Sequence, residues 1–265
     1  MANMNYSNLS IGIIGTGNIA STLGFSLISN GIEVKTVYSR NISKAKVLAQ
    51  KLNARAGSTN KRVFNEDVVF FCVPDDAIKN LLNAEIPFYT VCVHTSGSTP
   101  ISVFGNHPAA VLWPLQTFSK ADIVNNNLFS DGPVFVEGSD IHCRRYIKKL
   151  AEQLSEFVVE SNSEQRMIMH LAAVFACNFT NHMYTLAEKI CKNNGLDQTM
   201  LVPLIMKTAT RTMYASPFET QTGPAARNDK KTIKKQLDAL STETDIKKVY
   251  KSVTNSIFAM HKKQK

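Results

Sequence analysis

The chain has 265 residues, of which 44% are hydrophobic and 19% are charged. This composition is typical of a globular protein and excludes a largely disordered chain. No segment reaches the roughly 18 consecutive apolar residues that a membrane-spanning helix requires. Residues 1–8 also lack the basic start of a secretory signal. We therefore expect a soluble protein with no membrane partner.

The net charge is +9, and much of the excess comes from lysines after residue 229. A basic surface can bind nucleic acid, but these lysines are not interleaved with aromatic side chains in the manner that stacks on bases. A solvated helix face is the favoured interpretation, so we expect no nucleic-acid ligand. An excess of basic residues also suits a small ligand that is rich in phosphate.

Five cysteines are scattered through the sequence without a Cys-x-x-Cys spacing: Cys72, Cys92, Cys143, Cys177 and Cys191. Several lie in apolar runs, where a thiol behaves as a small hydrophobic side chain. The pattern predicts unpaired structural thiols in the reducing environment of the cytoplasm, and no metal site.

Residues 1–160 alternate between short apolar runs and helical patterns. Strands are expected at residues 9–14, 33–38, 68–73, 91–94, 111–115, 134–136 and 157–159, and helices at residues 19–29, 43–52 and 140–153. Buried strands that alternate with helices predict a parallel sheet with helices on both faces. The predicted fold class is therefore α/β, with a Rossmann-type, doubly wound, mostly parallel sheet in a domain of residues 1–160.

Residues 161–265 are predicted to form a second, all-helical domain. Ser161 and Glu164 have the spacing of a capping box, from which one helix would continue to residue 194 and end before Gly195. Further helices are expected at residues 198–213, 229–240 and 244–260. The long helix is apolar on nearly all sides between residues 167 and 179, so it must be buried all round. Packing against a second copy, in a homodimer formed through the C-terminal helices, would bury it.

A glycine motif follows the first strand. Gly15, Gly17 and Ala20 fit the pattern G-x-G-x-x-A, at the point where an apolar strand leads into a helical pattern. In a dinucleotide-binding turn, the first glycine permits the tight turn and the second permits close approach of the pyrophosphate, which meets the free N–H groups of the helix. The predicted cofactor contacts in this turn are Gly15, Thr16, Gly17, Asn18 and Ile19.

The second strand ends about 20 residues later, at Ser39 and Arg40. A site for NAD(H) would place an acidic residue there to bind the ribose hydroxyls. Ser39 and Arg40 instead offer a hydroxyl and a guanidinium fork, which suit a 2′-phosphate. The predicted cofactor is therefore NADP(H).

Two further strand ends are expected at the cofactor, because open α/β sheets bind ligands at the carboxyl ends of their strands. Val73 and Pro74 follow one strand, and Thr95 follows another. Thr95 and the hydroxyl-rich residues after it are expected near the nicotinamide.

Four segments, 94–97, 113–118, 170–179 and 222–229, together with the glycine turn, resemble a family of NADP oxidoreductases. That family joins a Rossmann-like domain to a helical C-terminal domain of uncharacterised function. It is related to pyrroline-5-carboxylate reductase, the deazaflavin-dependent NADP oxidoreductases and the β-hydroxyacid dehydrogenases. The resemblance implies a dimer with its active site between the Rossmann domain and the long helix. However, no lysine occurs between Glu164 and Asn178, so the lysine-dependent mechanism of β-hydroxyacid dehydrogenases is not expected.

The long helix carries a stripe of polar residues. At 100° per residue, an arc of about 80° contains His170, Asn178, Asn181, Thr185 and Glu188. We expect His170 and Asn178 to line the substrate cleft, with His170 as a general acid, because an imidazole titrates near neutral pH. The alternative is that His170 is a core histidine bonded to a backbone carbonyl.

His94 and Arg227 are two further candidate catalytic residues. His94 lies at a carboxyl edge of the sheet, where it could donate a proton or could simply order the following loop. Arg227 lies in a loop between helices and could bind a substrate carboxylate. The alternative for Arg227 is an ion pair with Asp229 or another neighbour.

The leading functional hypothesis is an NADPH-dependent reductase that transfers a hydride to a small imine or carbonyl substrate. A close variant would use a bound deazaflavin or flavin as the hydride partner. A different class of protein is a redox sensor that binds NADP(H) without hydride transfer. Oxidation of NADPH by any substrate would distinguish the enzymes from the sensor.

Overall fold

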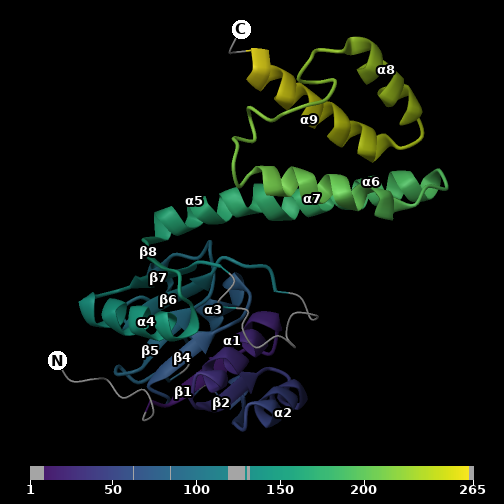
Figure 1. Cartoon of the computed structure of the whole chain (residues 1–265). Helices are drawn as coiled ribbons and strands as arrows, with labels where there is room; N and C mark the ends of the chain where they lie inside the picture. The colour runs from purple at the N-terminus through teal and green to yellow at the C-terminus, as the bar shows by residue number, and fades with distance from the viewer. Residues whose placement is uncertain (1–8, 62, 84, 119–128, 130–131, 263–265) are drawn as a thin grey trace. The chain divides into compact units, whose positions relative to one another are not determined.

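The computed structural model describes residues 9–61, 63–83, 85–118, 129 and 132–262. The chain divides into two compact units, Met1–Ala176 and Cys177–Lys265, and each is described by itself (Figure 1). The predicted domain boundary between residues 160 and 161 stays a prediction. The boundary between the compact units lies further along the chain, after Ala176, because the first helix after residue 160 packs on the first unit.

The described part of the first unit contains one eight-stranded sheet of order β3-β2-β1-β4-β5-β6-β7-β8. All neighbouring strands are parallel except β6 and β7, which are antiparallel. The strands are β1 (Ile11–Ile14), β2 (Val34–Ser39), β3 (Arg55–Ser58), β4 (Val68–Phe71), β5 (Val91–His94), β6 (Ala109–Pro114), β7 (Val134–Gly138) and β8 (Val158–Glu160).

Helices cover both faces of this sheet. They are α1 (Asn18–Ser29), α2 (Ile42–Lys51), α3 (Asp75–Leu81), α4 (Ile141–Leu154) and α5 (Ser163–Ala173). One apolar cluster joins α1, α2 and α4 to one face, and a second cluster joins α3 to the other. On this second face, His170 of α5 contacts Trp113 of β6. The prediction of a doubly wound, mostly parallel Rossmann-type sheet is confirmed.

One strand and one α-helix of the first unit were not predicted, β3 and α3. The β3 segment has the sequence RAGS and lies at the edge of the sheet, so it has no apolar run to mark it. Helix α3 has only seven residues, which is too short to show a helical period.

The start of α5 differs from the prediction by one residue. The capping box is formed by Asn162 and Gln165, not by Ser161 and Glu164. The Asn162 side chain accepts a bond from the Gln165 N–H at 2.8 Å, and the Gln165 side chain accepts one from the Asn162 N–H at 3.1 Å. Asparagine and glutamine provide the same reciprocal capping as serine and glutamate.

The predicted long helix is present, but it is not regular. A π-helical turn, η5 (Val174–Phe179), lies between α5 and α6 (Thr180–Asn193), and Gly195 follows with a φ of +66°. In the single chain, residues 167–179 are not buried all round, and the expectation that a second copy of the chain buries them stays a prediction. Between 40% and 62% of the surface is exposed at Met167, Ile168, Met169, Leu171, Phe175 and Phe179.

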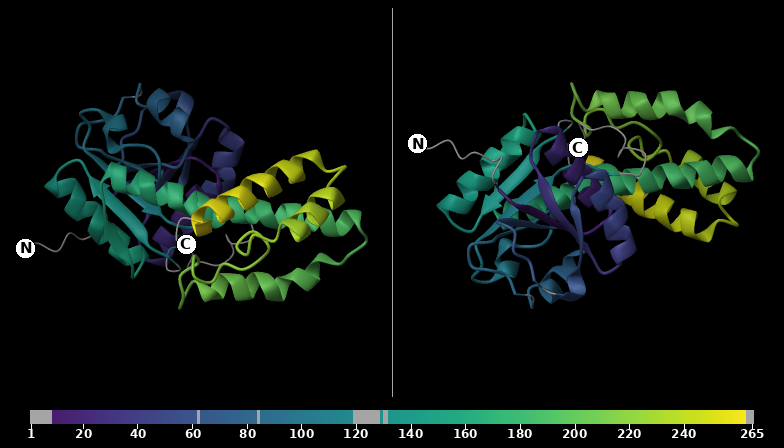
Figure 2. Two further views of the ribbon diagram at one scale, coloured as in Figure 1. Left: turned by 90° about the horizontal axis from the view of Figure 1, so that it is seen from above. Right: turned by 90° about the horizontal axis from the view of Figure 1, so that it is seen from below.

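The second unit is helical, as predicted. After α6 it contains the 3-10 turn η6 (Gln198–Leu201), α7 (Val202–Arg211), α8 (Lys230–Ala239) and α9 (Thr244–Lys262), which are coloured green to yellow in Figure 2. In the part of the chain that the structure describes, no helix is long and apolar enough to cross a membrane.

Candidate functional site

Gly15 occupies a position that excludes every side chain. Its φ is +128°, and a Cβ atom there would lie 2.1 Å from the carbonyl oxygen of Cys72. The Gly15 N–H donates to the carbonyl of Tyr38 at 2.8 Å. Gly15 therefore joins the ends of β1, β2 and β4 in one tight turn, as the glycine motif predicts.

Gly17 leaves the start of α1 open. It is the N-cap residue of α1, where no side chain caps the helix and no acidic residue lies in the first turn. A Cβ atom at Gly17 would meet nothing within 4 Å. The free N–H groups of the first turn therefore face open space, which suits the negative charge of a pyrophosphate.

A cavity of about 310 Å³ extends from this turn across the carboxyl ends of β1, β2 and β4. Seven of the ten predicted cofactor residues line it: Gly15, Thr16, Gly17, Ser39, Arg40, Val73 and Pro74. Thr59 and Asn80 also line the cavity, although no motif in the sequence marks either residue.

The other three predicted cofactor residues do not line this cavity, and their side chains instead contact other residues of the protein. The Asn18 side chain donates to the carbonyl of Phe118 at 2.8 Å, and Ile19 packs against the main core. Thr95 is nearly buried and hydrogen-bonds the thiol of Cys72. Burial raises the pKa of Cys72 to about 12, so this thiol stays protonated and is part of the core.

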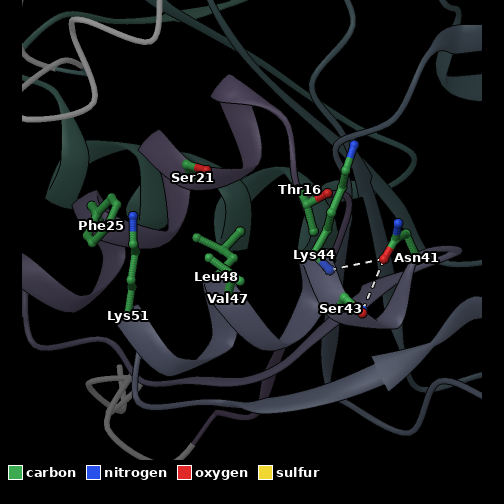
Figure 3. A pocket seen from close by; sticks show the side chains of 9 residues that line it. All are labelled: Thr16, Ser21, Phe25, Asn41, Ser43, Lys44, Val47, Leu48 and Lys51. Carbon is green, nitrogen blue, oxygen red and sulfur yellow. Dashed lines mark hydrogen bonds between the residues drawn. The ribbon is translucent and has the colours of Figure 1, made fainter.

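A second cavity, of about 350 Å³, adjoins the glycine turn at Thr16 and lies between α1 and α2 (Figure 3). Asn41 caps α2 by accepting bonds from the N–H groups of Ser43 and Lys44. Lys44 extends from this first turn beside Thr16 (Figure 3). Sequence reasoning missed Lys44, although its position four residues after Arg40, at the start of the next helix, was the available signal.

Arg40 lines the nucleotide cavity and Lys44 lines the adjoining cavity, so each contributes a cation on this side of the glycine turn. Both are exposed, and neither makes an ion pair within the described residues. No acidic residue occurs between residues 34 and 65. This end of the site therefore suits a doubly charged phosphate more than the hydroxyls of an unphosphorylated ribose.

His94 is wholly buried at the end of β5 and stacks on Phe104. Burial, assisted by the charge of Arg166, lowers the pKa of His94 to about 3. Its Nδ1 atom accepts a bond from the Ser96 N–H at 3.2 Å. These features suit the alternative role, in which a neutral His94 orders the loop after β5, better than the role of proton donor.

His170 lies over the same loop. Its ring meets the Trp113 ring edge-on, with 5.7 Å between the centroids. A Cβ atom at Gly97 would lie 2.9 Å from the His170 ring and 2.8 Å from the indole. His170 is half-buried and has no hydrogen-bond partner within the described residues, so its nitrogen atoms are free to act on a ligand.

Two candidate catalytic residues lie in the second unit. Asn178 is exposed within the π turn, and Arg227 is exposed in the loop before α8. Asp229 does not form an ion pair with Arg227 in the described part of the chain, because its carboxylate caps α8 through Thr232. The grouping of Asn178 and Arg227 with His170 stays a prediction.

No group of histidine, cysteine or acidic side chains among the described residues could hold a metal ion.

The Rossmann-type sheet and the open glycine turn define a fold of the dinucleotide-binding class. Residues 10–88 match the model of the family "NADP oxidoreductase coenzyme F420-dependent", and residues 132–257 match a domain of unknown function (DUF2520). No curated protein matches the chain.

A solved structure from Bacteroides fragilis, provisionally described as an NADP oxidoreductase, is 34% identical. The match covers 96% of this chain and 100% of that one, with a TM-score of 0.86. The chain therefore belongs to this family of NADP oxidoreductases with a Rossmann-like N-terminal domain and a DUF2520 C-terminal domain.

Two enzyme structures share the fold at low identity. A reductive aminase from Aspergillus terreus, in complex with NADPH and ethyl-5-oxohexanoate, is 14% identical over 96% of this chain and 93% of that one, with a TM-score of 0.65. A 1-pyrroline-5-carboxylate reductase from Streptococcus pyogenes is 13% identical over 95% and 98%, with a TM-score of 0.56.

Proposed function

We propose that the protein is an NADPH-dependent reductase that transfers a hydride to a small imine or carbonyl compound. The observation that carries this proposal is the glycine turn, which opens the positive end of α1 onto a cavity that Arg40 also lines. The pyrophosphate would bind the N–H groups of α1, and the 2′-phosphate would bind Ser39, Arg40 and Lys44. A bound nicotinamide would supply the hydride.

The loop after β5 would lie beside the nicotinamide, because it follows a strand at the same edge of the sheet. His170 lies over this loop and would give a proton to the nitrogen or oxygen atom of the reduced double bond. Trp113 and Gly97 would hold its ring in place. Asn178 and Arg227 remain proposed ligands for the substrate.

The proposed substrate class rests on His170, whose ring lies over the loop after β5. A carbonyl or imine is reduced by a hydride and a single proton, and His170 can supply that proton. The reductase and the aminase that share the fold are named for imine chemistry, which favours the same class.

A deazaflavin is the second candidate for the hydride partner. The model that matches residues 10–88 describes oxidoreductases that depend on coenzyme F420, which is a deazaflavin. In that case the protein would transfer a hydride between NADP(H) and the deazaflavin, through the same nucleotide cavity.

The test is NADPH oxidation, followed by absorbance, with a panel of cyclic imines, ketones with amines, and an oxidised deazaflavin. We expect turnover with one class, and we expect His170→Ala and Asn178→Ala to lower kcat by at least 10-fold while NADPH affinity changes by less than threefold. Loss of NADPH affinity in step with kcat would show that these residues are structural. NADPH binding without oxidation by any class would favour the sensor.

A further inference from the structure

Arg166, in the first turns of α5, is the largest wholly buried side chain in the described part of the protein. Its guanidinium forms an ion pair with Glu137 of β7. It also donates to the carbonyl of Thr99 at 2.6 Å and to the carbonyl of Ser96 at 3.2 Å. One side chain thus joins the helix, the sheet and the loop after β5.

Ser163 completes the same network. Its hydroxyl donates to the Glu137 carboxylate at 2.9 Å and accepts from the Ile101 N–H at 3.1 Å. Arg166 also donates to this hydroxyl at 3.4 Å. The buried charges are therefore paired and hydrogen-bonded, which is the condition under which a buried ion pair is tolerated.

Stability alone does not explain such a pair. Taking two charges out of water costs several kcal/mol per ion, and apolar residues of similar size are often at least as stabilising. What the pair supplies is a fixed geometry, because a guanidinium fork bonded to a carboxylate and two carbonyls permits a single arrangement of its neighbours.

The arrangement that it fixes includes His170. Arg166 and His170 are four residues apart on α5 and therefore lie on the same face of the helix. Arg166 holds the carbonyl of Ser96, and His170 contacts the next residue of the loop, Gly97. The loop is thus held at adjacent residues by two side chains of one helix.

We propose that Arg166 and Glu137 are positioning residues, which set the imidazole of His170 over the loop after β5. Neither residue needs to touch substrate. The catalytic part of this inference rests on the proposed function of His170 as a proton donor, but the positioning itself is a property of the protein without ligands. Catalytic geometry is sensitive to displacements of about 1 Å, which can cost roughly 100-fold in rate.

Trp113 is the single tryptophan of the chain, so its fluorescence reports directly on the contact with His170. An imidazole in contact with an indole ring quenches its emission. Emission of the protein without nucleotide is measured for the wild type and for His170→Gln, and the difference between the two gives the quenching that belongs to His170.

The test variant is the double substitution Arg166→Met and Glu137→Met, which leaves no unpaired buried charge. We expect it to fold and to bind NADPH within threefold of the wild type, since the glycine turn is untouched. We expect the His170-dependent quenching to fall at least twofold, and kcat to fall at least 10-fold. The matched control replaces the exposed ion pair Lys148–Glu160 of the same unit with two methionines. This control variant should keep the wild-type quenching and the wild-type kcat.

A folded Arg166→Met, Glu137→Met variant with wild-type quenching would overturn the positioning role. If that variant does not fold, Ser163→Ala provides the same test, because it removes one hydroxyl from the network and keeps both charges. A partial loss of quenching is then expected, and an unchanged amplitude contradicts the proposal. If NADPH is never oxidised, the proposed function fails, but the fluorescence result still decides the positioning.

Discussion

The two compact units of the chain differ in how they bury their apolar side chains. The first unit encloses continuous clusters on both faces of its sheet. Among the described residues of the second unit, the buried hydrophobic side chains are Ala225 and Ile246. Large apolar side chains are exposed along its helices, including Leu204 at 62% and Met206 at 58%. The nucleotide-binding unit therefore has a complete core, whereas the helical unit needs something to cover it.

The largest expected effect is on self-association, which tests whether the exposed apolar helices of the second unit are covered by another molecule. We propose that a second copy of the chain covers the helical unit, as the apolar pattern of residues 167–179 predicted. Leu204→Glu would place a lone carboxylate in the interface at a cost of about 3 kcal/mol, which is roughly a 100-fold weaker dimer. Sedimentation velocity over a range of protein concentrations measures the change.

The control for this prediction is Ile141→Glu, because Ile141 is an exposed apolar residue of the first unit, at 49%. It should leave the association state unchanged. A wild-type protein that is monomeric at micromolar concentration would show that a different molecule covers the helices.

The second prediction concerns the glycine turn of the first unit. Gly15→Ala forces a side chain into a positive φ and against the carbonyl of Cys72, so we expect the free energy of unfolding to fall by about 3 kcal/mol. Gly17→Ala is the matched control, because its Cβ would point into open space. Urea unfolding should show that Gly17→Ala is near the wild type in stability, while NADPH titration shows weaker binding. Equal stabilities for the two variants would contradict the described geometry.

The third prediction is a dependence of stability on pH. The folded protein keeps His94 neutral down to pH of about 3, whereas the unfolded chain takes up a proton below about pH 6.5. His94 therefore costs stability as pH falls from about 6.5, and the difference reaches about 2 kcal/mol at pH 5. His94→Gln keeps an acceptor for the Ser96 N–H and removes the titration. Urea unfolding at pH 7.5 and pH 5.0 should show a larger loss for the wild type, and equal losses would disprove the burial of a neutral His94.

Much of the first unit could be predicted from the sequence, because buried parallel strands are continuous apolar runs and the glycine motif marks the turn after β1. The same logic selected Ser39 and Arg40, which line the nucleotide cavity. The edge strand β3 could not be found, because an edge strand needs no apolar run. Nor does the sequence show that Arg166 is buried, since its partners Glu137, Ser96 and Thr99 lie 29 to 70 residues earlier in the chain.

The helical unit was predicted less completely, for a related reason. Its helices are marked by their periodicity and caps, but a π turn has no periodic signal of its own, and it interrupts the count of 100° per residue between His170 and Asn178. The polar stripe that joins these two residues therefore stays a prediction.

The central claim is that the first unit binds NADPH at the glycine turn and recognises its 2′-phosphate. The most direct test is a titration with NADPH and NADH, followed by energy transfer from Trp113 to the reduced nicotinamide, for the wild type, Arg40→Ala and the control Lys46→Ala. Lys46 is exposed on α2 and lines neither cavity, so it controls for the loss of one charge. The account predicts that Arg40→Ala weakens NADPH binding roughly 10- to 150-fold, corresponding to about 1.5–3 kcal/mol for a charged contact, and leaves NADH nearly unchanged. Binding of neither nucleotide at low-millimolar concentration, or equal weakening of both by Arg40→Ala, would contradict it.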